Sequence, residues 1–362
     1  MSTGDPRPGP DRSGGSCSGP EHPGGSRPVG GARRRPLAAF LPAAVVPIGL
    51  VVGIIAVSTS AILIRLADAP ALAVAFWRAA LGAVALAPAA ALAWSRLPRL
   101  DRRQVAQLAA SGVLLAVHFA LFIGSLDHTT VASATLFAVM SPLFVGIGQA
   151  VFLREPPGRR GWQGIAIALA GALVVGLDGL LAEPVAPGAS RVMGDVMAFA
   201  SAAAIAGYLL IGRSARVRLP VSAYASAVYG VAAVVLLPAS LLTGASLGLG
   251  GLRVGGVEPF AGTGDPYTAA TWWAIVAIVV GPQLLGHTVF NALLSRVPPV
   301  VVSVAVLAEP VGAGVLALLI FGEVPGWLVV AGAPLLLAGV WRATRAEAEP
   351  PEGLGSADVG ST

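Results

Sequence analysis

The 362-residue chain contains no lysine, a single cysteine and few charged residues of any kind. All 23 basic residues are arginine, and charged residues make up only 11% of the chain. Because Cys17 has no second cysteine to pair with, the sequence excludes a disulfide framework and a metal site built from thiolates. The shortage of charge excludes an ordinary soluble domain, in which roughly a quarter of the residues are charged.

Motifs that carry enzyme chemistry are missing from the sequence as well. It has no Gly-Lys-Ser loop for phosphate, no His and carboxylate cluster at metal-ligand spacing, and no nucleophile elbow. We therefore predict that the protein is not an enzyme, uses no cofactor or metal, and is not driven directly by ATP. Its net charge of +5 could suggest nucleic acid, but the arginines lie between apolar runs, as orientation signals do in membrane proteins. We predict no nucleic-acid partner.

Apolar residues dominate what is present. They form 56% of the chain, and the mean hydropathy is +0.80. Runs of about twenty apolar residues recur along the sequence, which is the length that an α-helix needs to cross a bilayer. We predict an all-α membrane protein with ten transmembrane helices, at about residues 46–66, 72–94, 105–125, 131–153, 162–178, 194–212, 223–243, 271–293, 300–321 and 326–342.

The segments outside these runs are polar or rich in glycine. Residues 1–36 have almost no aliphatic content, so they predict a disordered tail, and residues 343–362 predict a second, short tail. The connection at 244–270 is long and Gly-rich, and we expect it to be flexible.

The sequence is internally duplicated. Pro142 and Glu155 are spaced as Pro310 and Glu323 are, and glycines and leucines after them continue to match at a constant offset of 168 residues. This predicts two halves of five helices each, residues 46–178 and 194–342. Because five is odd, the second half must enter the membrane from the opposite side, so the halves are inverted repeats of the kind found in secondary transporters.

The distribution of arginine predicts the orientation. With the N-terminus inside, 19 arginines fall on the cytoplasmic side and only Arg65, Arg191 and Arg253 fall outside. Basic residues are retained on the cytoplasmic side of a membrane. We therefore expect both termini to be cytoplasmic, in a multi-pass protein of the plasma membrane, the bacterial inner membrane.

Glu309 is the leading candidate for a functional residue, because a carboxylate deep in an apolar span is costly unless it is paired, protonated or in contact with water. Pro310, which follows it, would break the helix and free a backbone carbonyl near Val306. The alternative is that Glu309 only forms a hydrogen bond to a neighbouring helix. Ser141 and Pro142 occupy the equivalent positions in the first half, and Ser141 is a further candidate for the substrate or proton pathway.

Four other candidate residues lie within the predicted spans. His118 and His287 each belong to the third helix of their half, and Asn291 is one turn beyond His287 on the same helix face. Each could line a substrate or proton pathway, or could be a packed hydrogen-bonding group. Arg78 could also line the pathway, or its side chain could extend outward to anchor the helix at the membrane surface.

Further features indicate structure rather than chemistry. Glu155 and Glu323 end their helices, where a solvated charge is inexpensive, so we interpret them as boundary residues. The small residues around Gly164, Gly171, Gly312 and Gly314 predict close packing between helices.

The quoted residues resemble the EamA-like permeases of the drug/metabolite transporter superfamily. The matching pieces are AFWRAALGAVAL, HFALFIGSLDHTTVASATLFAVMSPLFVGIGQAVFLRE, HTVFNALLSRVPPVVVSVAVLAEPVGAGVLALLIFGE and LLLAGV, within about residues 46–342. The resemblance implies a ten-helix transporter with cytoplasmic termini and a central cavity, often exporting amino acids, their derivatives or other small metabolites. The two halves differ at this position, because the first half has Ser141 where the second has Glu309.

We therefore expect a secondary active transporter that moves a small, amino-acid-like or drug-like metabolite, by proton-coupled export. Uptake or facilitated diffusion of a metabolite is the alternative within transport, and a non-transporting membrane accessory protein is the alternative of another class. The expected partners are the lipid bilayer and a small-molecule substrate. The sequence leaves the oligomeric state open, a homodimer included.

Overall fold

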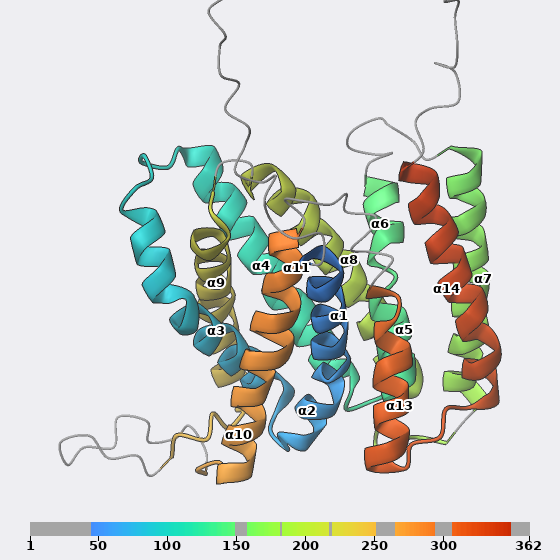
Figure 1. The fold of residues 1–362 in the computed structure, drawn as a ribbon. Coiled ribbons are helices and arrows are strands. Elements are labelled where there is room, and N and C mark those ends of the chain that lie inside the picture. The colour runs from blue at the N-terminus through green and yellow to red at the C-terminus, as the bar shows by residue number, and fades with distance from the viewer. Residues whose placement is uncertain are drawn as a thin grey trace, which may run out of the picture. The chain divides into compact units, whose positions relative to one another are not determined.

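The computed structural model describes residues 45–148, 158–181, 183–216, 219–250, 265–293 and 306–348, and every regular element within these ranges is a helix (Figure 1). The predicted tail at 1–36 and most of the tail at 343–362 lie outside the described residues. All described helices belong to the compact unit Ala43–Thr362.

The described helices of the first half are α1 (Val45–Ser58), α2 (Ser60–Leu66), α3 (Ala71–Trp94), α4 (Arg102–Ser125), α5 (Val131–Ala138), α6 (Ser141–Gly148) and α7 (Arg159–Leu181). Those of the second half are α8 (Arg191–Arg216), α9 (Val221–Leu242), α10 (Ala269–Ile278), the π-helix η3 (Val279–Thr288), α11 (Val289–Leu293), α13 (Glu309–Phe321) and α14 (Trp327–Ala348).

Within the described ranges, seven helical segments are long and apolar enough to cross a membrane: Val45–Leu66, Ala71–Trp94, Arg102–Ser125, Arg159–Asp178, Arg191–Gly212, Val221–Leu242 and Ala269–Leu293. Three shorter apolar helices occupy Val131–Val145, Glu309–Phe321 and Trp327–Ala343. The all-helical membrane fold is therefore confirmed. Each predicted run overlaps one of these ten segments, but three of the segments are shorter than the predicted spans.

Local sequence signals explain where several helices begin. Asp101 and Gln104 form a capping box at the start of α4, in which each side chain accepts from the other residue's backbone N–H. Thr130 caps α5 and Thr268 caps α10 through their side-chain oxygens. These caps satisfy N–H groups that the first helical turn leaves unpaired.

Several spans are interrupted near their middle. The first changes from α1 to α2 at Thr59, and the fourth has a turn at Val139 and Met140 between α5 and α6. The eighth contains η3, where Pro282 lacks the N–H that a regular helix needs. Before α13, Leu307 and Ala308 form another turn. Irregular backbone at membrane depth is tolerated where protein or a cavity surrounds it.

Helices of the two halves pack against one another in matched pairs. α7 contacts α14, α3 contacts α9, and α5 contacts α13. Figure 1 shows α7 and α14 side by side. The contact between α4 and α8 has its counterpart in the contact between η3 and α1. Three helices of the first half therefore contact their own equivalents in the second half. The other two contacts are equivalent to each other: the third span of each half packs against the first span of the other half.

The pair α7 and α14 depends on glycine. A methyl group on Gly171 would overlap the backbone of Leu336, and one on Gly339 would overlap the backbone of Ala168. Small residues let two helix backbones approach this closely in a membrane, where van der Waals packing drives association. The packing role predicted for the glycines of α7 is confirmed.

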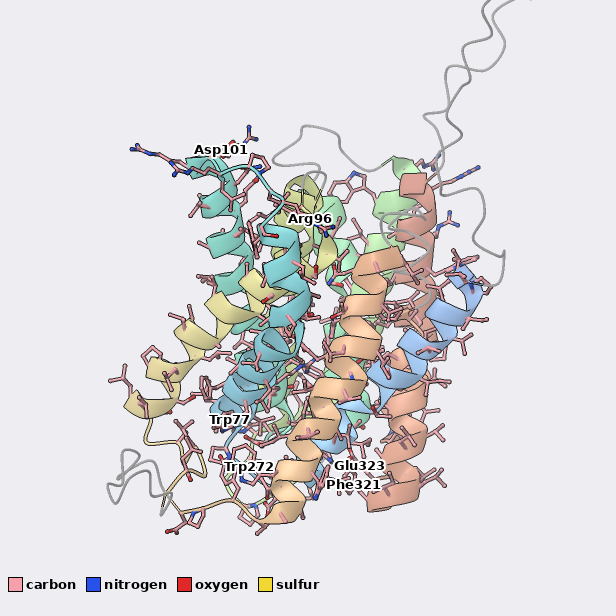
Figure 2. The ribbon with its side chains drawn as sticks, turned by 60° about the vertical axis from the view of Figure 1, so that its left-hand side comes forward. Trp77, Arg96, Asp101, Trp272, Phe321 and Glu323 are labelled. Atoms are coloured by element: carbon pink, nitrogen blue, oxygen red, sulfur yellow. The ribbon has the colours of Figure 1, made fainter. Side chains whose placement is uncertain are left out.

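The described ends of the connection at 244–270 are fixed by aromatic contacts, contrary to the expectation that the connection is flexible throughout. The Trp77 indole N–H donates to the carbonyl of Leu247 over 3.0 Å, and Trp77 and Trp272 pack edge to face. Figure 2 shows both tryptophans at the end of the bundle opposite to Arg96 and Asp101. Burial raises the pKa of Tyr267 to about 12, so its hydroxyl stays protonated and donates to the carbonyl of Ser246. Residues 251–264 lie outside the described part.

Candidate functional site

A cavity of about 80 Å³ lies where the interrupted spans meet. Residues from both halves line it, and they are Ser60, Arg78, His118, Phe122, Ala138, Val139, Ser141, Ile205, His287, Val306 and Glu309. Each of the four interruptions contributes to the lining. Ser60 follows the turn at Thr59, Val139 lies in the second turn, and Glu309 follows the turn at Leu307 and Ala308. The π-helix η3 contributes His287. The breaks thus place polar groups inside an otherwise apolar bundle.

Five of the six residues proposed from the sequence for the substrate or proton pathway line this one cavity: Glu309, His118, His287, Arg78 and Ser141. They come from five different helices that are distant in the chain. Such convergence is not a consequence of hydrophobicity, because all five residues are polar groups within apolar runs.

Glu309 is the first residue of α13 rather than the middle of a continuous helix. Pro310 therefore falls in the first turn, where its missing N–H has no helical partner to lose. This corrects the expectation that Pro310 frees a carbonyl near Val306, since the chain already turns at Leu307 and Ala308. The Ser58 hydroxyl lies 3.5 Å from the Glu309 carbonyl oxygen, at the limit for donating to it.

Ser141 repeats this arrangement in the first half. It begins α6 directly after the turn at Val139 and Met140, with Pro142 as the second residue of the helix. The two prolines therefore lie at equivalent helix starts, each directly after a residue that lines the cavity. The second half presents a carboxylate at this place, whereas the first presents a hydroxyl.

Arg78 is buried, with only 1% of its surface exposed, so the alternative of anchoring at the membrane surface is wrong. Its Nε donates to the Gln283 side-chain oxygen at 2.7 Å, and its Nη1 donates to the Ser60 hydroxyl at 3.3 Å. The guanidinium also lies over the ring of Phe119, 4.3 Å from the centroid. These contacts hold a full positive charge inside the bundle.

Glu309 and Arg78 line the same cavity from α13 and α3. Among the ion pairs formed within the described ranges, none joins these two side chains directly. The two side chains therefore line one cavity without being locked together.

His118 is buried and stacks on Phe122. Its Nδ1 lies 3.0 Å from the carbonyl oxygen of Ser201. Because a carbonyl can only accept, Nδ1 carries the hydrogen, which leaves Nε2 as the acceptor of the neutral ring. His287 is half-buried and lines the cavity from η3.

Asn291 is separated from the cavity, although the sequence placed it on one face with His287. Its amide donates to the hydroxyl of Tyr208 at 3.1 Å. The π-helical segment ends between the two residues, at Thr288, so the spacing of a regular α-helix does not hold across it. Asn291 joins two helices by a hydrogen bond.

The sequence analysis missed Gln283, which is completely buried and is the closest partner of Arg78. A signal was present, because Gln283 is an amide in an apolar span four residues before His287. In a regular α-helix, residues four apart share a face.

Glu323 is not a solvated boundary residue as the sequence suggested. Its carboxylate pairs with Arg65 and accepts from the N–H of Val131, at the start of α5. Arg65 also donates to the carbonyls of Leu126 and Thr129. The end of α13 is thus tied to α2 and to the α4–α5 connection. Glu155, its equivalent, lies outside the described residues.

The size of the cavity limits what this conformation can hold. A volume of about 80 Å³ accommodates a few waters or a very small ion, whereas pockets for drug-sized ligands are roughly 300–1,000 Å³. A metabolite could enter only if the lining helices moved apart. In the part of the chain that the structure describes, no group of three His, Cys, Asp or Glu residues is arranged to hold a metal ion.

Comparisons with known proteins agree with this architecture. No curated protein matches the sequence significantly. A solved structure described only as "Crystal structure of protein" has the same fold, with a TM-score of 0.55 and 19% sequence identity, covering 83% of this chain and 98% of the other. The model of the EamA-like transporter family matches twice, over residues 45–177 and 192–344, which together make up most of the chain. The protein is therefore a multi-pass membrane protein and a member of the EamA-like transporter family.

Proposed function

We propose that this protein is a secondary active transporter that exports a small metabolite in exchange for protons, with the cavity at Glu309 as the site of substrate and proton binding. The observation that carries the proposal is the convergence of Glu309, Arg78, His118, His287 and Ser141 on one cavity. Buried ionisable groups in membrane spans are costly, and they mark pathways for ions and substrates. A non-transporting accessory protein would have no use for them, and a sealed apolar bundle would serve it better.

The matched helix pairs support an arrangement of ten spans as two inverted repeats, at about residues 46–178 and 194–342. Equivalent helices meet each other, and the pairing of α4 with α8 recurs as that of η3 with α1. Inverted repeats allow two similar conformations that open to opposite sides. The small cavity of this conformation suits a state between them.

Glu309 is the residue that we assign to proton coupling. Since no described side chain forms an ion pair with it, its carboxylate can take up a proton without breaking one. A change in the protonation of Glu309 alters the charge of a cavity that Arg78 also lines, and this links proton occupancy to the electrostatics of the substrate site. Uptake or facilitated diffusion through the same cavity remains the second candidate.

A transport assay tests the proposal directly. Sealed vesicles that contain the purified protein are loaded with a panel of amino acids, their derivatives and drug-like solutes. They should release one class of solute faster than equally loaded vesicles that lack the protein. An imposed proton gradient should accelerate this release. Release that ignores the gradient would favour facilitated diffusion, and no release of any solute would contradict transport.

The orientation gives a separate prediction. Reporter proteins fused after residue 345, or inserted at 95–104, 155–161 and 214–220, should be accessible in the cytoplasm, and a reporter in 244–270 should be accessible outside. The reason is the retention of arginine on the cytoplasmic side, where 19 arginines would lie against three outside. A cytoplasmic reading for 244–270 would contradict both the orientation and the inverted repeats.

A further inference from the structure

The guanidinium of Arg78 has hydrogen-bonding capacity that the protein does not use. Nε and Nη1 donate to Gln283 and Ser60, but Nη2 is buried and has no hydrogen-bond partner among the described residues. An unpaired buried donor costs about 1–3 kcal/mol, and more when it is charged. Such a group calls for an acceptor that is not part of the chain.

Gln283 belongs to the same cluster. Its Oε1 accepts from Arg78, and its amide also lies at the hydroxyl of Tyr229. Arg78 and Gln283 are 1% and 0% exposed. Arg78 and Ser60 line the cavity, whereas Gln283 is not among its lining residues.

The charge of this cluster selects the kind of acceptor. Water would satisfy an N–H group but would leave the positive charge of Arg78 in a span without a direct counterion. A carboxylate supplies both acceptor oxygens and charge, and its planar shape matches the guanidinium.

We propose that Arg78 and Ser60 form a subsite for a carboxylate group of the transported substrate, with Gln283 holding the guanidinium in place. This rests on the proposed function and deepens it: the substrate carries an anionic end, and that end binds on the side of the cavity formed by α2, α3 and η3. The substrate is then an organic acid or a compound with a free carboxylate, rather than a simple cation or a neutral drug.

Acetate and acetamide are the probes that test this subsite. They have nearly the same size and shape and are small enough for a cavity of about 80 Å³, but only acetate is charged. With purified protein in detergent at constant ionic strength, acetate in the millimolar range should raise the unfolding temperature as its concentration increases. Acetamide and chloride should not. Equal effects of acetate and acetamide would overturn the proposal.

Gln283→Glu is the decisive variant, because it places a resident carboxylate on Arg78 while keeping the acceptor for Nε. The variant should fold, since it pairs a buried charge, and its apparent Kd for acetate should rise at least tenfold, an effect expected from losing charge-assisted hydrogen bonds. Arg96→Gln, at the distant end of the bundle in Figure 2, removes an arginine outside the cavity and should bind acetate normally. Unchanged acetate binding in Gln283→Glu would place the anion elsewhere.

The acetate-binding and transport experiments distinguish a failure of the subsite proposal from a failure of the proposed transport function. If vesicles transport cationic or neutral solutes and the detergent-purified protein ignores acetate, the subsite is wrong and the transport function stands. If acetate stabilises the wild type but not Gln283→Glu, and no solute crosses the vesicles, the subsite stands and the transport function is wrong.

Discussion

Glu309→Gln should reduce proton-driven transport by roughly tenfold or more, equivalent to about 1.4 kcal/mol in the transport barrier, while the protein still inserts into the membrane at normal levels. Glutamine keeps the shape and hydrogen bonding of the side chain but cannot gain or lose a proton. Folding should survive, because Ser141 occupies the equivalent helix start without an acid. The measurement is release of the identified solute from vesicles at several imposed proton gradients.

Two further variants sharpen this test. Glu309→Asp keeps a titratable group but withdraws it from the cavity, so it should retain partial activity with an altered pH dependence. Glu183→Gln removes a carboxylate that is exposed in a connection, and it should transport as the wild type does. Wild-type transport by Glu309→Gln, with an unchanged response to the gradient, would mean that Glu309 is only a hydrogen-bonding residue.

Apolar runs and internal repetition were enough to predict the all-helical membrane fold and several residues that line the cavity. Glu309 stood out because a carboxylate at membrane depth is rare and costly. Internal duplication then pointed to Ser141 and the two prolines, since equivalent residues of inverted repeats lie at equivalent depths. Both inferences depend only on how far along its apolar run a residue lies, which the sequence shows directly.

The direction in which a side chain faces could not be predicted in the same way. Depth alone allowed Arg78 to reach the membrane surface or the interior, and only the packing of α3 against α9 and η3 decides for the interior. The partner of Glu323 is likewise invisible locally, because Arg65 lies 258 residues away.

Breaks in the helices limited the prediction further. A continuous helix was assumed from 300 to 321, whereas α13 begins at Glu309. Pro282 lies in the π-helix η3, whose spacing removes Asn291 from the face of His287. A proline in a sequence signals a disturbance, but neighbouring helices determine whether the chain kinks, widens or starts anew.

The largest effect on stability should come from Gly339→Ala in α14. The added methyl group would overlap the backbone nitrogen of Ala168 and lie 2.8 Å from the carbonyl oxygen of Gly164, both in α7. Backbone atoms cannot rotate away as a side chain can, so the two helices must separate along a contact that joins the halves of the protein. Overpacking of this kind typically costs about 1–3 kcal/mol.

Gly230→Ala in α9 is the matched control, because a methyl group there would meet nothing within 4 Å. In a helix, alanine is favoured over glycine by roughly 0.8–1 kcal/mol, so this variant should be neutral or slightly more stable. The two variants therefore make the same chemical change, but we expect Gly339→Ala to lower the stability and Gly230→Ala to leave it unchanged or raise it. Thermal unfolding of the detergent-purified variants should show a lower midpoint for Gly339→Ala and an unchanged or higher one for Gly230→Ala. Equal midpoints would show that α7 and α14 are not packed backbone to backbone.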